Sequence, residues 1–214
     1  MPAASSRPTA PPLGRRRRRD AQANQERLVK AAIEVMAREG ITVPLSVIAE
    51  AAGVGIGTFY RRFPDRASLL EELAVRGYGD LTVILGELVA AEHLSGIDAV
   101  RVFLERSVAI GDRLILPLRG APPVSTPGSR RGRESVASKL DALLELGRRD
   151  GSIRAGVTAI DIAVASAILT QPPQGGRHWD AIAARHSAVY VAGLAAGTES
   201  PGAPRSTSTT TDAA

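Results

Sequence analysis

Four side chains within seven positions supply most of the anion-binding chemistry in this sequence: Tyr60, Arg61, Arg62 and Arg66. A phenolic hydroxyl donates a hydrogen bond to a phosphate oxygen, and a guanidinium group binds a phosphate through two parallel hydrogen bonds. The same guanidinium fork matches the O6 and N7 atoms of guanine. The alternative is a solvated basic surface with no ligand. The segment that precedes these residues favours a contact with nucleic acid.

Residues 45–63 have the pattern of two short helices joined by a tight turn. Ile48 and Ala52 share one face of the first helix, and the small Ala49 stands beside them where two helices could cross closely. Gly53 follows at the point where the chain must reverse, and glycine adopts a positive φ without steric cost. The pattern therefore predicts a helix-turn-helix.

The second helix of this motif is expected over about Ile56–Arg62, with Phe59 and Phe63 on its core side. Its N-terminal positions are small, which would let the backbone approach a phosphate or a base edge closely. In a helix-turn-helix the second helix lies in the major groove and reads bases with its N-terminal part. The spacing thus predicts that the basic and phenolic side chains lie on a DNA-facing surface.

The same glycines raise an alternative of another class. Gly53, Gly55 and Gly57 could form the phosphate-cradling loop of a nucleotide-dependent enzyme. Such a loop needs a strand before it and an acidic residue about 20 positions later. The preceding segment has helical spacing, and the glycine pattern is GxGxG rather than GxGxxG. The DNA-reading interpretation is therefore favoured.

The net charge of +5 is unevenly distributed. Residues 1–76 hold thirteen Arg and Lys against eight Asp and Glu, whereas the rest of the chain holds fourteen of each. All the excess positive charge thus lies in the part that contains the helix-turn-helix, as expected of a DNA-binding half joined to a neutral half. The run Arg15–Arg19 is either a solvated charge run or an arm that contacts phosphates or a minor groove.

Other function classes find little support in the composition. The chain has no cysteine, so disulfides and thiolate metal sites are excluded, and a reducing, cytoplasmic setting is expected. No apolar run follows the N-terminal arginines, and the longest uncharged apolar stretch, 162–170, is far shorter than the ~20 residues that span a bilayer. The three histidines have no ligand spacing, and no nucleophile motif is found. We predict no enzyme activity, catalytic residue, metal, cofactor or membrane partner.

A family resemblance extends these observations. The segment from Ile48 to Leu70, with the run Gly55-Ile-Gly-Thr-Phe-Tyr-Arg-Arg-Phe-Pro64, resembles the DNA-binding domain of TetR-family transcriptional regulators. Asp20–Ala32 is similar to the first helix of that domain, so the resemblance covers about residues 20–80.

By resemblance, Tyr60 and Arg66 match positions that contact phosphates, whereas Arg61 is predicted to bind DNA without an assignment to phosphate or base. The positions near base edges are matched by Gly55, Ile56, Gly57, Thr58 and Arg62. Many family members have a phosphate-binding threonine where this chain has Pro44, which cannot make that contact.

The resemblance and the helical periodicities together predict an all-α fold of about nine helices. We expect disordered tails at 1–14 and 198–214, a DNA-binding domain over 15–80 and a helical effector-binding and dimerisation domain over 81–197. In the first domain and its continuation, helices are expected over about Asp20–Glu39, from about Pro44, over Ile56–Arg62 and from a cap at Asp65 to about His93. In the rest of the chain, helices are expected over about Ile97–Leu116, Glu134–Arg149, Ala159–Thr170 and His178–Ala196. A loop is expected over Pro117–Arg133.

The resemblance implies a homodimeric repressor that binds a near-palindromic DNA operator and is released by a small-molecule effector. No residue is assigned to the effector site at this point. Two alternatives stay open: the nucleotide-dependent enzyme described above, and an architectural DNA-binding protein without an effector. The neutral, apolar C-terminal half argues against the second, because coating DNA does not require a second core.

Overall fold

The computed structural model of the protein describes residues 13–114, 126–171 and 179–197. These residues form eight α-helices and one short 3-10 helix with no strand among them, which confirms the all-α prediction. The helices are α1 (Leu13–Glu39), α2 (Leu45–Ala51), α3 (Ile56–Arg62), α4 (Arg66–Val89), α5 (Gly96–Ala109), η1 (Gly111–Arg113), α7 (Pro127–Arg149), α8 (Ala159–Leu169) and α9 (Trp179–Leu194).

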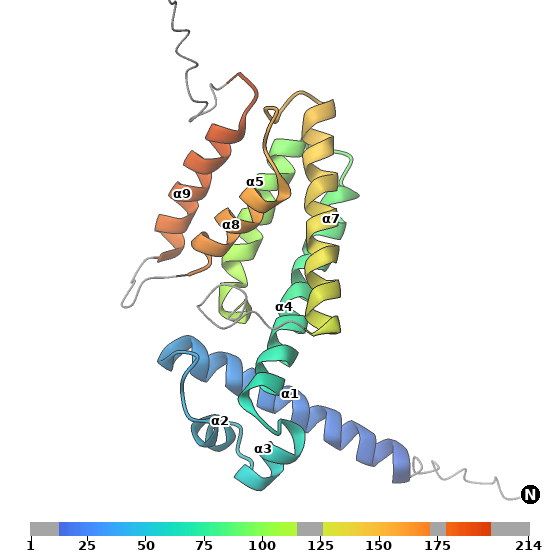
Figure 1. Ribbon diagram of the computed structural model, residues 1–214, viewed down its shortest axis with the longest axis vertical. Helices are drawn as coiled ribbons and strands as arrows, with labels where there is room; N and C mark the ends of the chain where they lie inside the picture. The colour runs from blue at the N-terminus through green and yellow to red at the C-terminus, as the bar shows by residue number, and fades with distance from the viewer. Residues whose placement is uncertain (1–12, 115–125, 172–178, 198–214) are drawn as a thin grey trace, which may run out of the picture.

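The helices divide into a small group and a larger bundle (Figure 1). α1, α2 and α3 lie together at the base of the view, and α5, α7, α8 and α9 stand above them. α4 belongs to both groups, because it rises from α3 and packs along α7. None of the described helices has the length and apolar character needed to cross a membrane.

The small group encloses a core of its own. α1 contributes an apolar stripe at helical spacing, α2 contributes Ile48 and Ala49, and α3 contributes Phe59. The buried members are Leu28, Val29, Ala31, Ala32, Val35, Met36, Val43, Ile48, Ala49, Ala52, Phe59, Phe63, Leu69, Leu70, Leu73 and Ala74. The stripe on α1, which includes Leu28, Ala32 and Val35, is buried.

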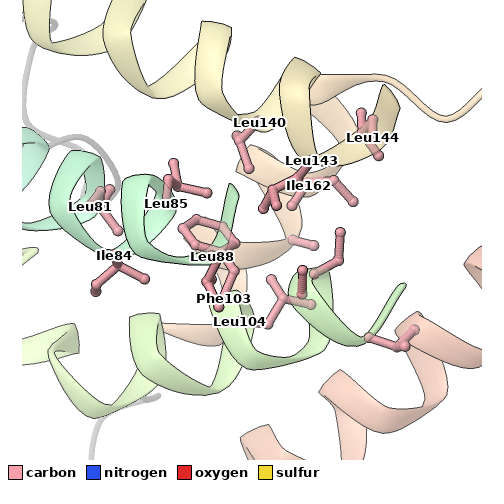
Figure 2. Close-up of a cluster of buried hydrophobic side chains, with 14 of the residues drawn as sticks. Leu81, Ile84, Leu85, Leu88, Phe103, Leu104, Leu140, Leu143, Leu144 and Ile162 are labelled. Carbon is pink, nitrogen blue, oxygen red and sulfur yellow. The ribbon is translucent and has the colours of Figure 1, made fainter. Parts of the chain in front are cut away.

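The bundle has a second core, drawn in Figure 2. Leucines and isoleucines of α4 meet Phe103 and Leu104 of α5, and α7 covers them with Leu140, Leu143 and Leu144. Ile162 of α8 completes the centre of this cluster. Large aliphatic side chains at helical spacing on four elements thus bury one another, which is the main stabilising term of a helical bundle.

α4 connects the two cores through one continuous helix. Asp65 caps its start, accepting a hydrogen bond from the Ser68 amide at 2.7 Å, as the sequence predicted. Leu69 and Leu73 belong to the first core, whereas Leu81 and the apolar residues after it belong to the second. The helix continues through Gly77 and Gly79 and ends at Val89, four residues before the expected end.

Two helices begin earlier than predicted. α1 starts at Leu13 rather than Asp20, so the expected tail boundary at residue 14 and the run Arg15–Arg19 fall inside a helix. α7 starts at Pro127 rather than Glu134, so the expected loop ends seven residues sooner. Thr126 caps α7, Pro127 needs no hydrogen-bond partner for its missing N–H, and both features favour a helix start that the glycine and arginine content concealed.

The remaining boundaries differ little from the expected ones. α5 ends at Ala109 and is followed by the separate turn η1, instead of continuing toward Leu116. α8 and α9 lie within two residues of the predicted bounds. The predicted tails over 1–12 and 198–214 and the loop over 117–125 lie outside the described residues.

Candidate nucleic-acid interface

The turn between α2 and α3 is fixed by backbone hydrogen bonds. The Gly53 amide donates to the Glu50 carbonyl at 2.9 Å, and the Val54 amide donates to the Ala49 carbonyl at 3.0 Å. This pair of bonds requires a left-handed residue after the helix, and Gly53 has a φ of +67°. The predicted positive φ is confirmed. Because the Gly53–Gly57 segment follows a helix, it lacks the strand-loop-helix context of a nucleotide-binding loop.

Two phenylalanines anchor α3 against the core. Phe59 is fully buried, Phe63 is buried just after the helix ends, and their ring centroids lie 5.6 Å apart. Both were predicted as core residues. Since successive residues on a helix turn by about 100°, these anchors direct the opposite face of α3 away from the protein.

That opposite face carries most of the predicted DNA-contacting residues. Arg61 and Arg62 are exposed, and Ile56 and Tyr60 keep 43% and 47% of their surface accessible. Thr58 is half-buried. Gly55 and Gly57 are exposed as well, and no other atom lies within 4 Å of where a Cβ would stand on either. The N-terminal part of α3 is therefore open enough for a groove wall to approach its backbone.

Arg61 lies near the middle of the exposed face, between Gly57 and Thr58 by helical spacing. Its Nη2 donates a hydrogen bond to the Thr58 hydroxyl at 2.8 Å. Arg61 was predicted to contact DNA without an assignment to base or phosphate, and the position of the two anchors places it at the centre of the exposed face. Thr58 and Arg61 thus form a pre-ordered pair of one hydroxyl and one guanidinium group.

Arg62 is held to α4. Its Nη2 lies 3.6 Å from a carboxylate oxygen of Glu72, and its guanidinium carbon stands 5.0 Å from the Phe63 ring centroid. Glu72 also accepts hydrogen bonds from Arg76 and from Gln25 of α1, each at 2.9 Å. One carboxylate therefore joins α1, α3 and α4.

Arg66 forms hydrogen bonds within the helix-turn-helix region. Its Nη1 donates to the Ile41 carbonyl at 2.5 Å, and its Nη2 donates to the Val43 carbonyl. These bonds tie the start of α4 to the connection between α1 and α2. The phosphate contact inferred from the resemblance stays a prediction, and the structure adds a bracing role that spacing alone did not indicate.

The bundle contains a cavity of about 540 Å³ beside α4. Most of its walls are apolar side chains of α4, α5, α7 and α8, among them Leu81, Phe103, Val136, Leu140 and Ala163. The sequence did not locate these walls. The residues come from four helices that are far apart along the chain, so no local spacing pattern marks them.

The outer face of α8 and α9 is apolar and uncovered. Ile160, Val164 and Ile168 repeat every four residues on α8 and are 66%, 48% and 63% exposed, and Val189 of α9 is 74% exposed. A groove of about 580 Å³ lies along them and is also lined by Trp179, His186 and Tyr190. α8 is thus apolar on two faces, because its other side buries Ile162, Ala165 and Leu169.

Comparisons with known proteins agree with this geometry. Residues 28–73 match the model of the family described as "Bacterial regulatory proteins, tetR family". No curated protein matches the chain. A TetR transcriptional regulator from Streptomyces coelicolor is similar in structure, with 26% identity, a TM-score of 0.56 and coverage of 81% of this chain and 99% of that one.

Two further solved structures extend the likeness. A TetR transcription regulatory protein from Mycobacterium vanbaalenii is 27% identical, with a TM-score of 0.56 over 83% of this chain and 98% of that one. The regulator FadR from Bacillus subtilis, in complex with stearoyl-CoA, has the same fold at 19% identity, with a TM-score of 0.61 over 79% of this chain and 99% of that one. The matching DNA-binding domain and the fold shared along nearly the whole length of these regulators lead to one conclusion: the chain is a DNA-binding transcriptional regulator of the TetR family.

Proposed function

We propose that the protein is a homodimeric repressor that binds a near-palindromic operator and is released from it by a small molecule in the cavity beside α4. The observation that carries this proposal is that α4 belongs both to the core of the helix-turn-helix and to the core of the bundle. The helix holds Leu69 and Leu73 in the core of the helix-turn-helix, and two turns later it presents Tyr78 and Leu81 to the cavity. A ligand that shifts this helix would shift the DNA-reading surface with it.

The proposed domain boundary follows from the two cores. Ala74 is the last buried residue of the first core and Leu81 is the first of the second. We therefore propose a DNA-binding domain that ends near residue 80 and an effector and dimerisation domain that follows to about residue 197. A DNA-binding regulator acts where the chromosome is, so we expect the protein in the cytoplasm.

We propose that the N-terminal part of α3 reads bases while flanking residues hold phosphates. Gly55, Ile56, Gly57, Thr58 and Arg62 are assigned to the base edges, and Tyr60 and Arg66 are assigned to the backbone. The outward position of Arg61 supports adding it to the surface that enters the groove. Phosphate contacts fix position without reading sequence, whereas base contacts carry the specificity.

The uncovered apolar face of α8 and α9 supports dimerisation. Monomeric proteins rarely expose a continuous apolar patch of this kind, and it lies on the bundle rather than on the helix-turn-helix. A second copy related by two-fold symmetry would bury the same face on both partners. Two recognition helices would then meet half-sites about 34–36 Å apart, or a multiple of that distance.

Release by an effector requires unequal binding to two states. The ligand must bind the DNA-released conformation better than the DNA-bound one, since a ligand with equal affinity for both shifts nothing. The volume of the cavity lies in the range of small-molecule sites. The similar FadR structure holds stearoyl-CoA, which supports a ligand-binding role for a bundle of this fold.

The first test is selection of bound fragments from random duplex DNA by the purified protein at ~0.15 M salt, because low salt inflates non-specific binding. We expect a two-fold symmetric motif, and sedimentation should give a dimer. Folded protein that enriches no motif would contradict the operator proposal and favour an architectural role. Tight binding of ATP or NAD(P) that is lost in Gly55→Ala would favour the nucleotide-dependent enzyme.

Variants then separate the roles on α3. Tyr60→Phe and Arg66→Ala should weaken binding to operator and random DNA alike, and Arg66→Ala should also lower stability because it removes the bonds to the Ile41 and Val43 carbonyls. Thr58→Ala should in addition relax the sequence preference. Equal losses on operator and random DNA for all three variants would contradict the base-reading assignment.

A further inference from the structure

The polar groups of the cavity beside α4 are unevenly distributed. Tyr78 of α4 and Arg133 of α7 line the same cavity, whereas its other walls are mainly Leu, Val, Ile, Phe and Ala. Neither the phenol nor the guanidinium group makes a hydrogen bond or ion pair with the part of the chain that the structure describes. Two strong donors are thus available at one end of an apolar space.

Tyr78 and Arg133 line the cavity where α7 packs closely on α4. Burial raises the pKa of Tyr78, and the positive charge of Arg133 opposes that rise, so the phenol is a neutral donor near pH 7. The position of Tyr78 is set by Gly132, which stands one residue before Arg133. A Cβ on Gly132 would lie only 2.7 Å from the Tyr78 Cβ, so only glycine lets α7 pass this close to α4.

Among the described residues that line the cavity, Asp141 alone is acidic, and Glu71 does not line it. Glu71 contributes to the raised pKa of Tyr78, but its Oε1 accepts hydrogen bonds from the Thr126 hydroxyl and the Ser129 amide. Asp141 also lines the cavity, but it lies eight residues farther along α7, which corresponds to about 12 Å of helix. The basic residue that lines the cavity therefore stands near Tyr78, and the acidic residue that lines it stands farther along α7.

We propose that the effector is an apolar molecule with a single carboxylate, bound with that carboxylate on Arg133 and Tyr78 and its apolar body between Leu81, Phe103 and Leu140. A guanidinium group binds a carboxylate through two parallel hydrogen bonds, and the Tyr78 hydroxyl supplies a third donor. Asp141 repels a second anionic group at the far end. The carboxylate joins α4 to α7 directly, which is the contact that release from DNA would use. This inference rests on the proposed effector role of the cavity.

The test measures ligand affinity by calorimetry at neutral pH with acid and alcohol pairs that share a skeleton. The probes are decanoate with decanol, naphthylacetate with naphthylethanol, and decanedioate as the molecule with two carboxylates. At least one monocarboxylate should bind more tightly than its alcohol, and decanedioate should bind more weakly than decanoate. Arg133→Gln should weaken the carboxylate about tenfold or more and leave the alcohol unchanged, because only a charge-assisted contact is lost.

Two further variants complete the design. Arg130→Gln removes an exposed arginine one turn away on α7 that does not line the cavity, and it should bind every probe as the unaltered protein does. Tyr78→Phe should weaken the carboxylate by a smaller factor than Arg133→Gln. Circular dichroism checks that each variant is folded.

Several results would overturn the proposal: an alcohol that binds as tightly as its acid, a carboxylate affinity unchanged by Arg133→Gln, or no binding of either monocarboxylate. Operator binding measured in parallel separates this inference from the proposed function. Carboxylate binding that depends on Arg133, in a protein that selects no DNA motif, would leave the ligand site standing and contradict the repressor. Operator release by the alcohols but not by the acids would support the repressor and contradict the carboxylate site.

Discussion

The core around the helix-turn-helix and the core of the bundle are built from the same aliphatic and aromatic side chains, yet they differ in how completely they fill space. The first surrounds Phe59 on every side and places its functional groups on the outer face of a seven-residue helix. The second borders a partly open, mostly apolar cavity of about 540 Å³ and leaves one helical face uncovered. A filled core holds a surface rigidly, whereas an incompletely filled core can respond to what enters it.

The two cores also place the side chains proposed to bind ligands differently. On α3 the functional groups point outward from a scaffold that does not need to move. In the bundle they point into a space bounded by α4, and α4 is also part of the first core. The proposed release by an effector would therefore act through the position of this one helix rather than through either core alone.

The largest effect should come from emptying the filled core. Phe59→Ala should lower the free energy of unfolding by about 3–5 kcal/mol, because it removes a fully buried ring and leaves a cavity in its place. Urea denaturation followed by circular dichroism measures the loss. The adjacent Tyr60→Ala is the control and should change stability by less than about 0.5 kcal/mol, since that ring is exposed. A loss below about 1 kcal/mol for Phe59→Ala would show that this core is not tightly filled.

The same substitution in both regions tests the comparison directly. Ala49→Leu should cost about 1–3 kcal/mol, because Ala49 is buried where α2 packs in the first core. Ala163→Leu should be nearly neutral, because Ala163 lines the cavity and the added atoms enter empty space. Thermal denaturation of the two variants gives the difference. Equal losses would contradict the contrast between a filled and an incompletely filled core.

The junction between the regions should show a smaller effect. Glu71 of α4 accepts hydrogen bonds from Thr126 and from the Ser129 amide at the start of α7, and its Oε2 is buried without a partner among the described residues. Glu71→Ala should cost about 1–2 kcal/mol through these lost bonds.

The control for this junction lies on the same helix. Glu87 forms an exposed ion pair with Arg106 at 2.6 Å, and Glu87→Ala should cost less than about 1 kcal/mol. Chemical denaturation compares the two variants. A larger loss for Glu87→Ala than for Glu71→Ala would show that the carboxylate at the start of α7 does not hold the junction.

The smallest effect concerns the start of α8. Hydrogen bonds from the Thr158 hydroxyl and the Thr158 amide lower the pKa of Asp161. A lowered folded-state pKa stabilises the protein above the ordinary aspartate pKa of about 3.9, and the contribution is lost as pH falls through the folded value. Thr158→Val should raise the pKa of Asp161, and Thr158→Ser should restore it, as measured by NMR titration of the carboxyl carbon. An unchanged pKa in Thr158→Val would exclude the hydroxyl as its cause.

Local signals in the sequence were sufficient for the turn between α2 and α3, the cap of α4 and the core side of α3. Gly53 supplies the one backbone conformation that the turn requires, Asp65 caps α4, and Phe59 and Phe63 repeat on the core side of α3. Each of these effects acts within a few residues, so spacing alone predicts it. The early start of α7 was missed because glycine and arginine content concealed its local cap, and because Glu71, which also binds this helix start, lies 58 residues from Ser129 along the chain.

The sequence by itself determined the helical class, the helix-turn-helix and the location of the excess positive charge, because periodicity, capping and composition are local properties. Only the tertiary structure decided which arginines face outward and which ones brace the fold. Arg66 binds the carbonyls of Ile41 and Val43, and Arg62 pairs with Glu72, whereas Arg61 lies at the centre of the exposed face. It also decided where the cavity lies, since a cavity is the space left between helices and its walls share no spacing along the chain.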